Sequence, residues 1–67
     1  MTSPKQIAMR LKRLRKARKL SQYALAAEAG ISREYLRKLE AGLSDPTVGM
    51  LTKLAKALGV PVTELLG

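Results

Sequence analysis

The side chains best suited to recognise another molecule lie together in the stretch R-E-Y-L-R-K-L-E, residues 33–40. Leu36 and Leu39 are three residues apart, so on a helix they mark the side that is buried. The opposite side then carries three donors and one acceptor: Glu34, Arg37 and Lys38, with Arg33 at the exposed N-terminal end. Arginine and lysine donate to guanine O6 and N7, and glutamate accepts from cytosine N4. This face therefore has the chemistry to read G·C base pairs.

The same face has a simpler interpretation, in which it is only a solvated surface. Glu34 and Lys38 are four residues apart, which is the spacing of an exposed ion pair on a helix. In an isolated amphipathic helix this simpler interpretation is the commoner one. The choice between the two depends on the elements that surround the stretch.

The residues just upstream, S-Q-Y-A-L-A-A-E-A-G, predict another short helix. Ser21 is a good N-cap, because its hydroxyl can accept from a free N–H group in the first turn. Gly30 can adopt the left-handed conformation that ends a helix, and Ser32 can cap the next one. Two short helices, over 21–29 and 32–40, joined by a glycine turn form a helix-turn-helix.

The first turn of the helix over 21–29 has unpaired N–H groups that attract an anion. Gln22 lies in this turn, either as a phosphate contact or as an ordinary polar residue. Tyr23 has two interpretations of equal weight. Its hydroxyl contacts a phosphate, or its ring packs half-exposed against the fold.

The remaining residues predict three further helices, over about 5–18, 47–58 and 62–66. Apolar residues recur at helical spacing in the first two of these segments, and residues 1–4 are expected to be a frayed end. The prediction is an all-α fold in which residues 1–67 form a single five-helix domain around the central helix-turn-helix.

Composition narrows the class of partner. The 67 residues carry a net charge of +8, from 13 basic and 5 acidic side chains. Such a charge favours an anionic partner, with nucleic acid first and an acidic membrane surface second. There is no Cys or His and the acids are scattered, so the sequence predicts no enzyme, no metal, no cofactor and no small-molecule ligand. Charges interrupt every apolar run, and the N-terminus lacks a secretory apolar region, so no membrane association is expected.

Several short motifs occur in an order that is specific as a set: L-K-R-L-R-K at 11–16, L-S-Q at 20–22, A-G-I-S-R at 29–33, L-R-K-L-E-A-G at 36–42 and L-A-K-A-L-G-V at 54–60. With these motifs the chain, from Ile7 to Leu66, resembles the Cro/C1-type (Xre, lambda-repressor-like) DNA-binding domain. The resemblance implies a cytoplasmic, nucleoid-associated prokaryotic or phage transcriptional regulator, acting as a repressor on double-stranded DNA. It implies a homodimer on a palindromic operator, with half-sites about one helical turn (~34 Å) apart.

The resemblance also assigns roles to individual residues. The helix over 32–40 would enter the major groove, with base-reading positions at Ser32, Arg33, Glu34 and Lys38, and with Arg37 reading a base or taking a phosphate. Phosphate contacts would come from Ser21, Gln22, Tyr23 and the backbone of Gly42, and Gln22 would also brace Arg33. A partly buried ion pair would join Arg15 to Glu40.

The chain departs from the family pattern at three places. Lys19 stands where a glycine is usual, so a strained backbone is expected there. The sequence S-Q-Y-A at 21–24 lacks a capping box. The loop from Gly42 to Asp45 has no basic residue to hold a phosphate. As an alternative to a phosphate contact in this loop, Leu43 could make an apolar contact with a partner subunit.

The expected dimer surface is the apolar C-terminal end: Val60, Val62, Leu65 and Leu66.

One alternative function uses the same fold, as an RNA-binding or protein-bridging co-activator module. Only two aromatic residues are present, Tyr23 and Tyr35, which argues against a stacking platform for single strands. A membrane-active amphipathic helix is disfavoured, because the apolar residues are spread over several short helices that must pack against one another to be stable.

Overall fold

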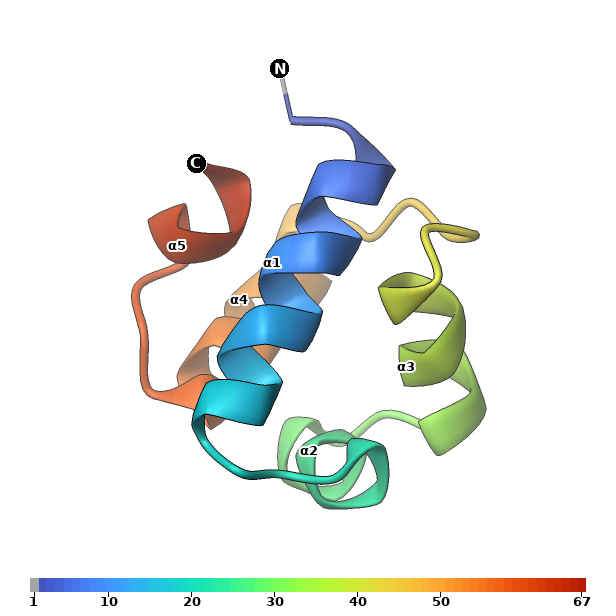
Figure 1. Ribbon diagram of the computed structural model, residues 1–67, viewed down its shortest axis with the longest axis vertical. Helices are drawn as coiled ribbons and strands as arrows, with labels where there is room; N and C mark the ends of the chain where they lie inside the picture. Colours follow the sequence, from blue (N-terminus) through green and yellow to red (C-terminus); the bar gives the residue numbers. More distant parts are fainter. Residues whose placement is uncertain (1) are drawn as a thin grey trace.

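The structure is a computed structural model that describes residues 2–67, which form five α-helices and no strand. The helices are α1 (Pro4–Ala17), α2 (Gln22–Ala29), α3 (Arg33–Glu40), α4 (Val48–Leu58) and α5 (Thr63–Leu66) (Figure 1). Each begins and ends within one residue of the range expected from the sequence. The all-α prediction with a central helix-turn-helix is confirmed.

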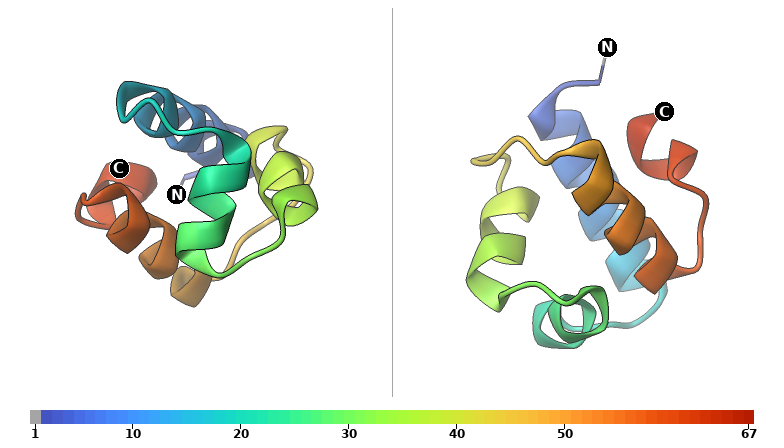
Figure 2. Two further views of the ribbon diagram at one scale, coloured as in Figure 1. Left: turned by 90° about the horizontal axis from the view of Figure 1, so that it is seen from below. Right: turned by 180° about the vertical axis from the view of Figure 1, so that it is seen from behind.

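Leucines from every helix form the core. The fully buried ones are Leu11, Leu25, Leu36, Leu39, Leu51, Leu54, Leu58 and Leu65. Burying a leucine stabilises a fold by roughly 1.5–3 kcal/mol, so this cluster is the main source of cohesion. Helix α1 packs between α3 and α5, and the view from behind shows α4 covering the other side of the core, with α2 at one end (Figure 2).

The beginning of α1 differs from the frayed end expected over residues 1–4. The Ser3 Oγ accepts from the Gln6 backbone N–H at 3.2 Å, and the Gln6 Oε1 accepts from the Ser3 N–H at 3.1 Å. This is a capping box, with Pro4 at the first helical position. The Thr2 hydroxyl also donates to the Leu66 carbonyl, which ties the two ends of the chain together. The expectation is therefore wrong for residues 2–4, and Met1 lies outside the described residues.

The turn between α1 and α2 confirms the strain expected at Lys19. Its φ is +56°, in the left-handed region that glycine adopts most easily. The Leu20 N–H donates to the Arg15 carbonyl at 3.1 Å across this residue and closes the end of α1. Gly30, at the turn between α2 and α3, has a φ of +72°, as expected for a C-cap.

None of the helices within residues 2–67 has the length and apolar character needed to cross a membrane.

Candidate nucleic-acid interface

The N-terminus of α2 lies beside the C-terminal end of α3, where Gln22 contacts Glu40. Ser21 caps α2 by accepting from the Ala24 N–H at 3.0 Å, without a capping box, as its sequence predicted. The N–H groups of the first turn of a helix have no intrahelical partner, and together with the helix dipole they favour an anion. Tyr23, in the same turn, is 70% exposed, so its ring does not pack against the fold and its hydroxyl is free for a contact.

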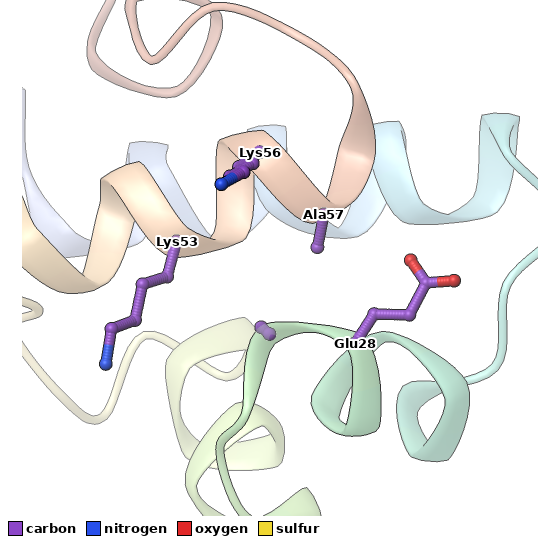
Figure 3. A pocket seen from close by; sticks show the side chains of 5 residues that line it. Glu28, Lys53, Lys56 and Ala57 are labelled. Atoms are coloured by element: carbon purple, nitrogen blue, oxygen red, sulfur yellow. The ribbon is translucent and has the colours of Figure 1, made fainter.

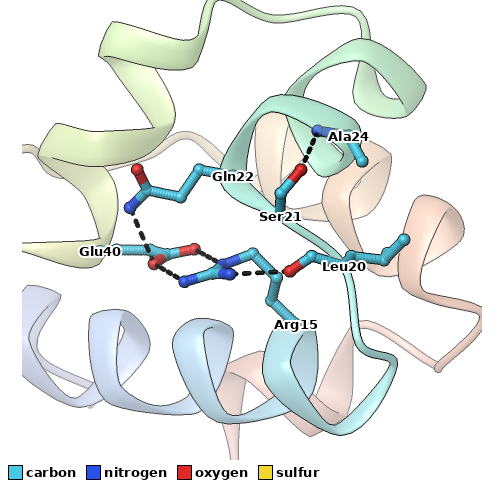
Figure 4. Close-up of polar contacts among 6 residues, drawn as sticks. All are labelled: Arg15, Leu20, Ser21, Gln22, Ala24 and Glu40. Carbon is cyan, nitrogen blue, oxygen red and sulfur yellow. Dashed lines mark hydrogen bonds and ion pairs between the residues drawn. The ribbon is translucent and has the colours of Figure 1, made fainter.

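A buried polar network fixes α3 relative to α1 and α2 (Figure 4). Arg15 on α1 donates from Nε to Glu40 Oε2 at 2.6 Å and from Nη2 to Glu40 Oε1 at 2.9 Å. The Arg15 Nη1 donates to the Leu20 carbonyl at 2.8 Å, which links the α1–α2 turn to the same group. The side chain of Glu40 is only 3% exposed and that of Arg15 10%. The ion pair that the family resemblance implied is therefore present.

Gln22 belongs to this network. Its Nε2 donates to Glu40 Oε1 at 3.2 Å, and no hydrogen bond joins it to Arg33 within residues 2–67. The bracing of Arg33 expected from the family is thus replaced by a bond to the buried carboxylate. The bond holds the Gln22 side chain between α2 and α3, half-buried in the first turn of α2. One N–H of its amide remains free for another acceptor.

The outward face of α3 carries the polar residues predicted from the leucine spacing. Leu36 and Leu39 are buried, and the opposite residues Arg33, Glu34, Arg37 and Lys38 are all exposed. Ser32 caps the helix by accepting from the Tyr35 N–H at 3.0 Å, and its hydroxyl hydrogen can still be donated outward.

The ion pair on this face joins Glu34 to Arg37 rather than to Lys38. Arg37 donates from Nε to Glu34 Oε1 at 3.0 Å and from Nη2 to Oε2 at 2.7 Å. The planar guanidinium matches a carboxylate with two parallel bonds, which the point charge of a lysine cannot do. The hydrogen bonds from Arg37, with the nearby charges of Arg37, Lys38 and Arg33, lower the pKa of Glu34 below its ordinary 4.5.

Sequence reasoning missed Lys12. A hollow of about 210 Å³ is lined by residues of three helices: Lys12, Gln22, Arg37, Glu40 and Ala41. It brings the Lys12 cation to the edge where the α2 N-terminus and α3 meet. The signal was weak, because Lys12 is one of six basic residues on α1 and only packing shows which of them faces α3.

The loop after α3 uses its backbone donors internally. The Gly42 N–H donates to the Leu39 carbonyl at 3.2 Å, and the Leu43 N–H donates to the Lys38 carbonyl at 3.0 Å. Gly42 has a φ of +74°, so its part is to end α3. The phosphate contact expected from the Gly42 backbone has no free donor there. Leu43 is 72% exposed, which leaves it accessible to a partner.

A helix-turn-helix family model (HTH_3) matches residues 11–65, which include every residue named above for this interface. The chain belongs to the helix-turn-helix family. The match confirms the resemblance drawn from the motifs, and it places the chain in a family of DNA-binding transcription regulators rather than in a class of enzymes.

Two relatives show what this helix-turn-helix chain is similar to. The HTH-type transcriptional regulator y4dJ of Sinorhizobium fredii is 42% identical over 65 residues, which are 97% of this chain and 84% of the relative. The immunity repressor protein of Bacillus phage phi105 is 39% identical over 61 residues, or 91% of this chain. The helix-turn-helix chain spans only 42% of the length of that phage repressor.

Among solved structures, the chain is similar to the master regulator for biofilm formation SinR, which was determined in complex with DNA. The TM-score is 0.87 and the identity 35%, over 91% of this chain and 98% of the SinR chain. The backbone of the helix-turn-helix is therefore similar to that of a regulator whose structure was determined in complex with DNA.

The C-terminal face of this helix-turn-helix chain corrects one expectation. Leu65 is fully buried in the core, so it cannot be a dimer contact without unfolding α5. Val60, Val62 and Leu66 are half-buried and pack against the core, so much of the apolar surface expected to be free at this end is covered. The three retain partial exposure at this end.

A larger hollow, of about 510 Å³, lies between α2 and α4 and away from the α3 face (Figure 3). Glu28 of α2 lines it together with Lys53 and Lys56 of α4. None of the residues that line this hollow belongs to α3.

Proposed function

We propose that this helix-turn-helix protein represses transcription by binding a short double-stranded DNA operator, with α3 in the major groove. The family makes the chain a DNA-binding transcription regulator, and the repressor role draws support from the phage immunity repressor among its relatives. The observation that carries the proposal is the exposed α3 face, held in place by the buried Arg15–Glu40 pair.

Base reading is assigned to the outer face of α3. Arg33, Arg37 and Lys38 supply donors for guanine O6 and N7, and Ser32 can bond to several bases. Glu34 belongs to this face through its pair with Arg37. The expected preference is for G·C-containing half-sites.

Phosphate contacts are assigned to the edge of the interface. The first turn of α2, with Ser21, Gln22 and Tyr23, offers backbone N–H groups, a half-free amide and an exposed hydroxyl. Lys12 adds a cation from α1 beside the same turn. These contacts hold the register of α3 on the duplex without reading sequence.

We further propose a homodimer on a palindromic operator. A single short recognition helix reads few base pairs. Two copies, on half-sites about one helical turn (~34 Å) apart, double the number of base pairs that are read. Val60, Val62 and Leu66, which retain partial exposure at the C-terminal end, are the proposed contact. Sedimentation without DNA at tens of micromolar tests it, and a monomeric mass would exclude a stable dimer.

Selection from a random duplex pool at near-physiological salt, with single-stranded RNA as competitor, tests DNA reading. Enrichment of a palindrome with G·C in each half-site is expected. The variant Lys38→Ala should then weaken the base preference at one position of the half-site. Lys53→Ala, which removes an equal charge from α4, should leave every base preference unchanged. Retention without an enriched sequence would contradict specific binding and favour the RNA-binding or co-activator function.

A further inference from the structure

The Glu34–Arg37 pair lies on the proposed reading face of α3, and both of its members are solvent-exposed. The side chain of Arg37 is 51% exposed and that of Glu34 61%. Both carboxylate oxygens of Glu34 accept from Arg37, so the carboxylate has its best acceptor directions filled before any DNA arrives.

The bonds to Glu34 use only one edge of the guanidinium. Arg37 employs Nε and one hydrogen of Nη2 in the pair. A guanidinium carries five N–H donors in a fixed plane, so both hydrogens of Nη1 and the second of Nη2 remain. The Nη1–Nη2 edge is therefore a complete two-donor fork, the arrangement that matches guanine O6 and N7.

On the basis of the DNA-binding function above, we propose that Arg37 reads a guanine through its Nη1–Nη2 edge and that Glu34 is the positioning residue that orients it. Glu34 then does not accept from a cytosine. The specificity of this position comes from the pair as a unit.

The carboxylate also selects the kind of acceptor that Arg37 can take. A phosphate that approached the free edge would meet the negative charge of Glu34 a few ångströms away, and the two anions repel each other. The guanine edge presents neutral acceptors and incurs no such repulsion. Glu34 thus disfavours a sequence-independent phosphate contact and leaves the base contact as the better use of Arg37.

Glu34 is charged under the conditions in which DNA binds. The hydrogen bonds from Arg37, together with the charges of Arg37, Lys38 and Arg33, hold its pKa below the ordinary value. It therefore remains a carboxylate at neutral pH, and the orientation of Arg37 does not depend on a change in protonation.

The test measures affinity for the selected operator and for duplexes with each half-site base pair changed, at several salt concentrations. The variants are Glu34→Ala, Arg37→Ala, Arg37→Lys and the double variant Glu34→Ala/Arg37→Ala. Glu28→Ala is the matched control, because it removes another exposed carboxylate, on α2 and away from the α3 face. Melting curves check that all variants are folded.

Glu34→Ala and Arg37→Ala should each reduce discrimination at the same G·C pair, on the order of tenfold. The double variant should lose no more than Arg37→Ala alone, and Arg37→Lys should not restore discrimination, because lysine has no fork. Glu34→Ala should also bind non-specific DNA more tightly with a steeper salt dependence, while Glu28→Ala should leave discrimination unchanged.

Three results would overturn the proposal while the DNA-binding function stands. Arg37→Ala could weaken binding equally for all sequences and reduce the salt slope by about 0.9, as expected for a phosphate contact. The two single variants could lose discrimination at different base pairs, which would make Glu34 an independent base-reading residue. Glu34→Ala could leave discrimination intact. If instead the wild-type protein enriches no sequence, the proposed function itself fails.

Discussion

Helix α3 carries a glutamate near each end, and each holds an arginine with two hydrogen bonds. Glu40 takes Arg15 at 2.6 and 2.9 Å, and Glu34 takes Arg37 at 2.7 and 3.0 Å. The two pairs are nearly identical in geometry. They differ in solvent exposure, since the Glu40 side chain is 3% exposed and that of Glu34 61%.

The difference in exposure separates a structural pair from a recognition pair. Inside the fold, Glu40 and Arg15 are removed from water, and Gln22 and the Leu20 carbonyl complete their hydrogen bonding. No side-chain polar atom buried within residues 2–67 is left without a partner. Outside, water screens the Glu34–Arg37 pair, so it adds little to stability. The role that we propose for it is to orient donors toward DNA.

The largest expected effect comes from breaking the inner pair. Glu40→Ala leaves the Arg15 charge buried without its partner, which costs about 3–5 kcal/mol in the free energy of unfolding. Glu34→Ala should change this free energy far less and alter sequence preference more. Chemical denaturation and operator binding of both variants measure the comparison, and the reverse order would refute both assignments.

A matched double variant sharpens this result. Arg15→Met/Glu40→Leu removes both charges at once, so no buried charge is stranded. It should be more stable than Glu40→Ala. Equal loss in the two variants would mean that the charge itself is not the cause.

A smaller effect is expected from Gln22→Ala. This change removes one hydrogen bond to Glu40 but leaves both bonds from Arg15, so it should cost about 1 kcal/mol. Tyr23→Ala, at the neighbouring exposed position, should leave the unfolding free energy unchanged. If Gln22→Ala cost as much as Glu40→Ala, Gln22 rather than Arg15 would be the main partner of the carboxylate.

Salt should separate the two pairs further. Raising the ionic strength from 0.1 to 1 M shortens the screening length from about 10 Å to about 3 Å, which weakens exposed charge pairs and affects buried ones much less. Double-mutant cycles at both salt concentrations should therefore show a coupling between residues 15 and 40 that persists. The coupling between residues 34 and 37 should fall, and equal salt dependence would contradict the contrast.

The smallest expected effect is on the titration of Glu34. Arg37 lowers the pKa of this carboxyl, so the contribution of the pair is present above the ordinary value of 4.5 and is lost as the pH falls through the lowered pKa. NMR titration of Arg37→Ala should show the Glu34 pKa rising toward 4.5. Lys53→Ala should leave the lowered pKa of Glu34 unchanged. An unchanged Glu34 pKa in Arg37→Ala would show that the pair does not form in solution.

Much of the fold was predictable because its signals are local. Ser21, Gly30 and Ser32 mark helix ends through the conformations that their own residue types favour, and the leucine spacing marks the buried sides. The capping box at Ser3 and Gln6 was also present in the sequence as S-P-K-Q, so the frayed end was an error of interpretation.

Other features depended on residues far apart in the sequence. The pairing of Arg15 with Glu40 spans 25 residues and came from the family resemblance. Helical spacing sets Glu40 beside Leu36 near the buried side of α3, but no local pattern identifies its partner. The burial of Leu65 was likewise missed, since a leucine in a short terminal helix suits a core or a dimer surface equally.

The sequence by itself determined where the helices begin and end and which side of α3 faces outward, because caps and apolar periodicity act within one or two turns. Only the tertiary structure decided the roles of the charged residues. It placed Glu40 in the interior, turned Gln22 toward it, and left Glu34 to hold Arg37 in solvent. Burial is a property of the packed chain, and burial determines whether the loss of one partner strands a charge inside the fold or only frees a donor in solvent.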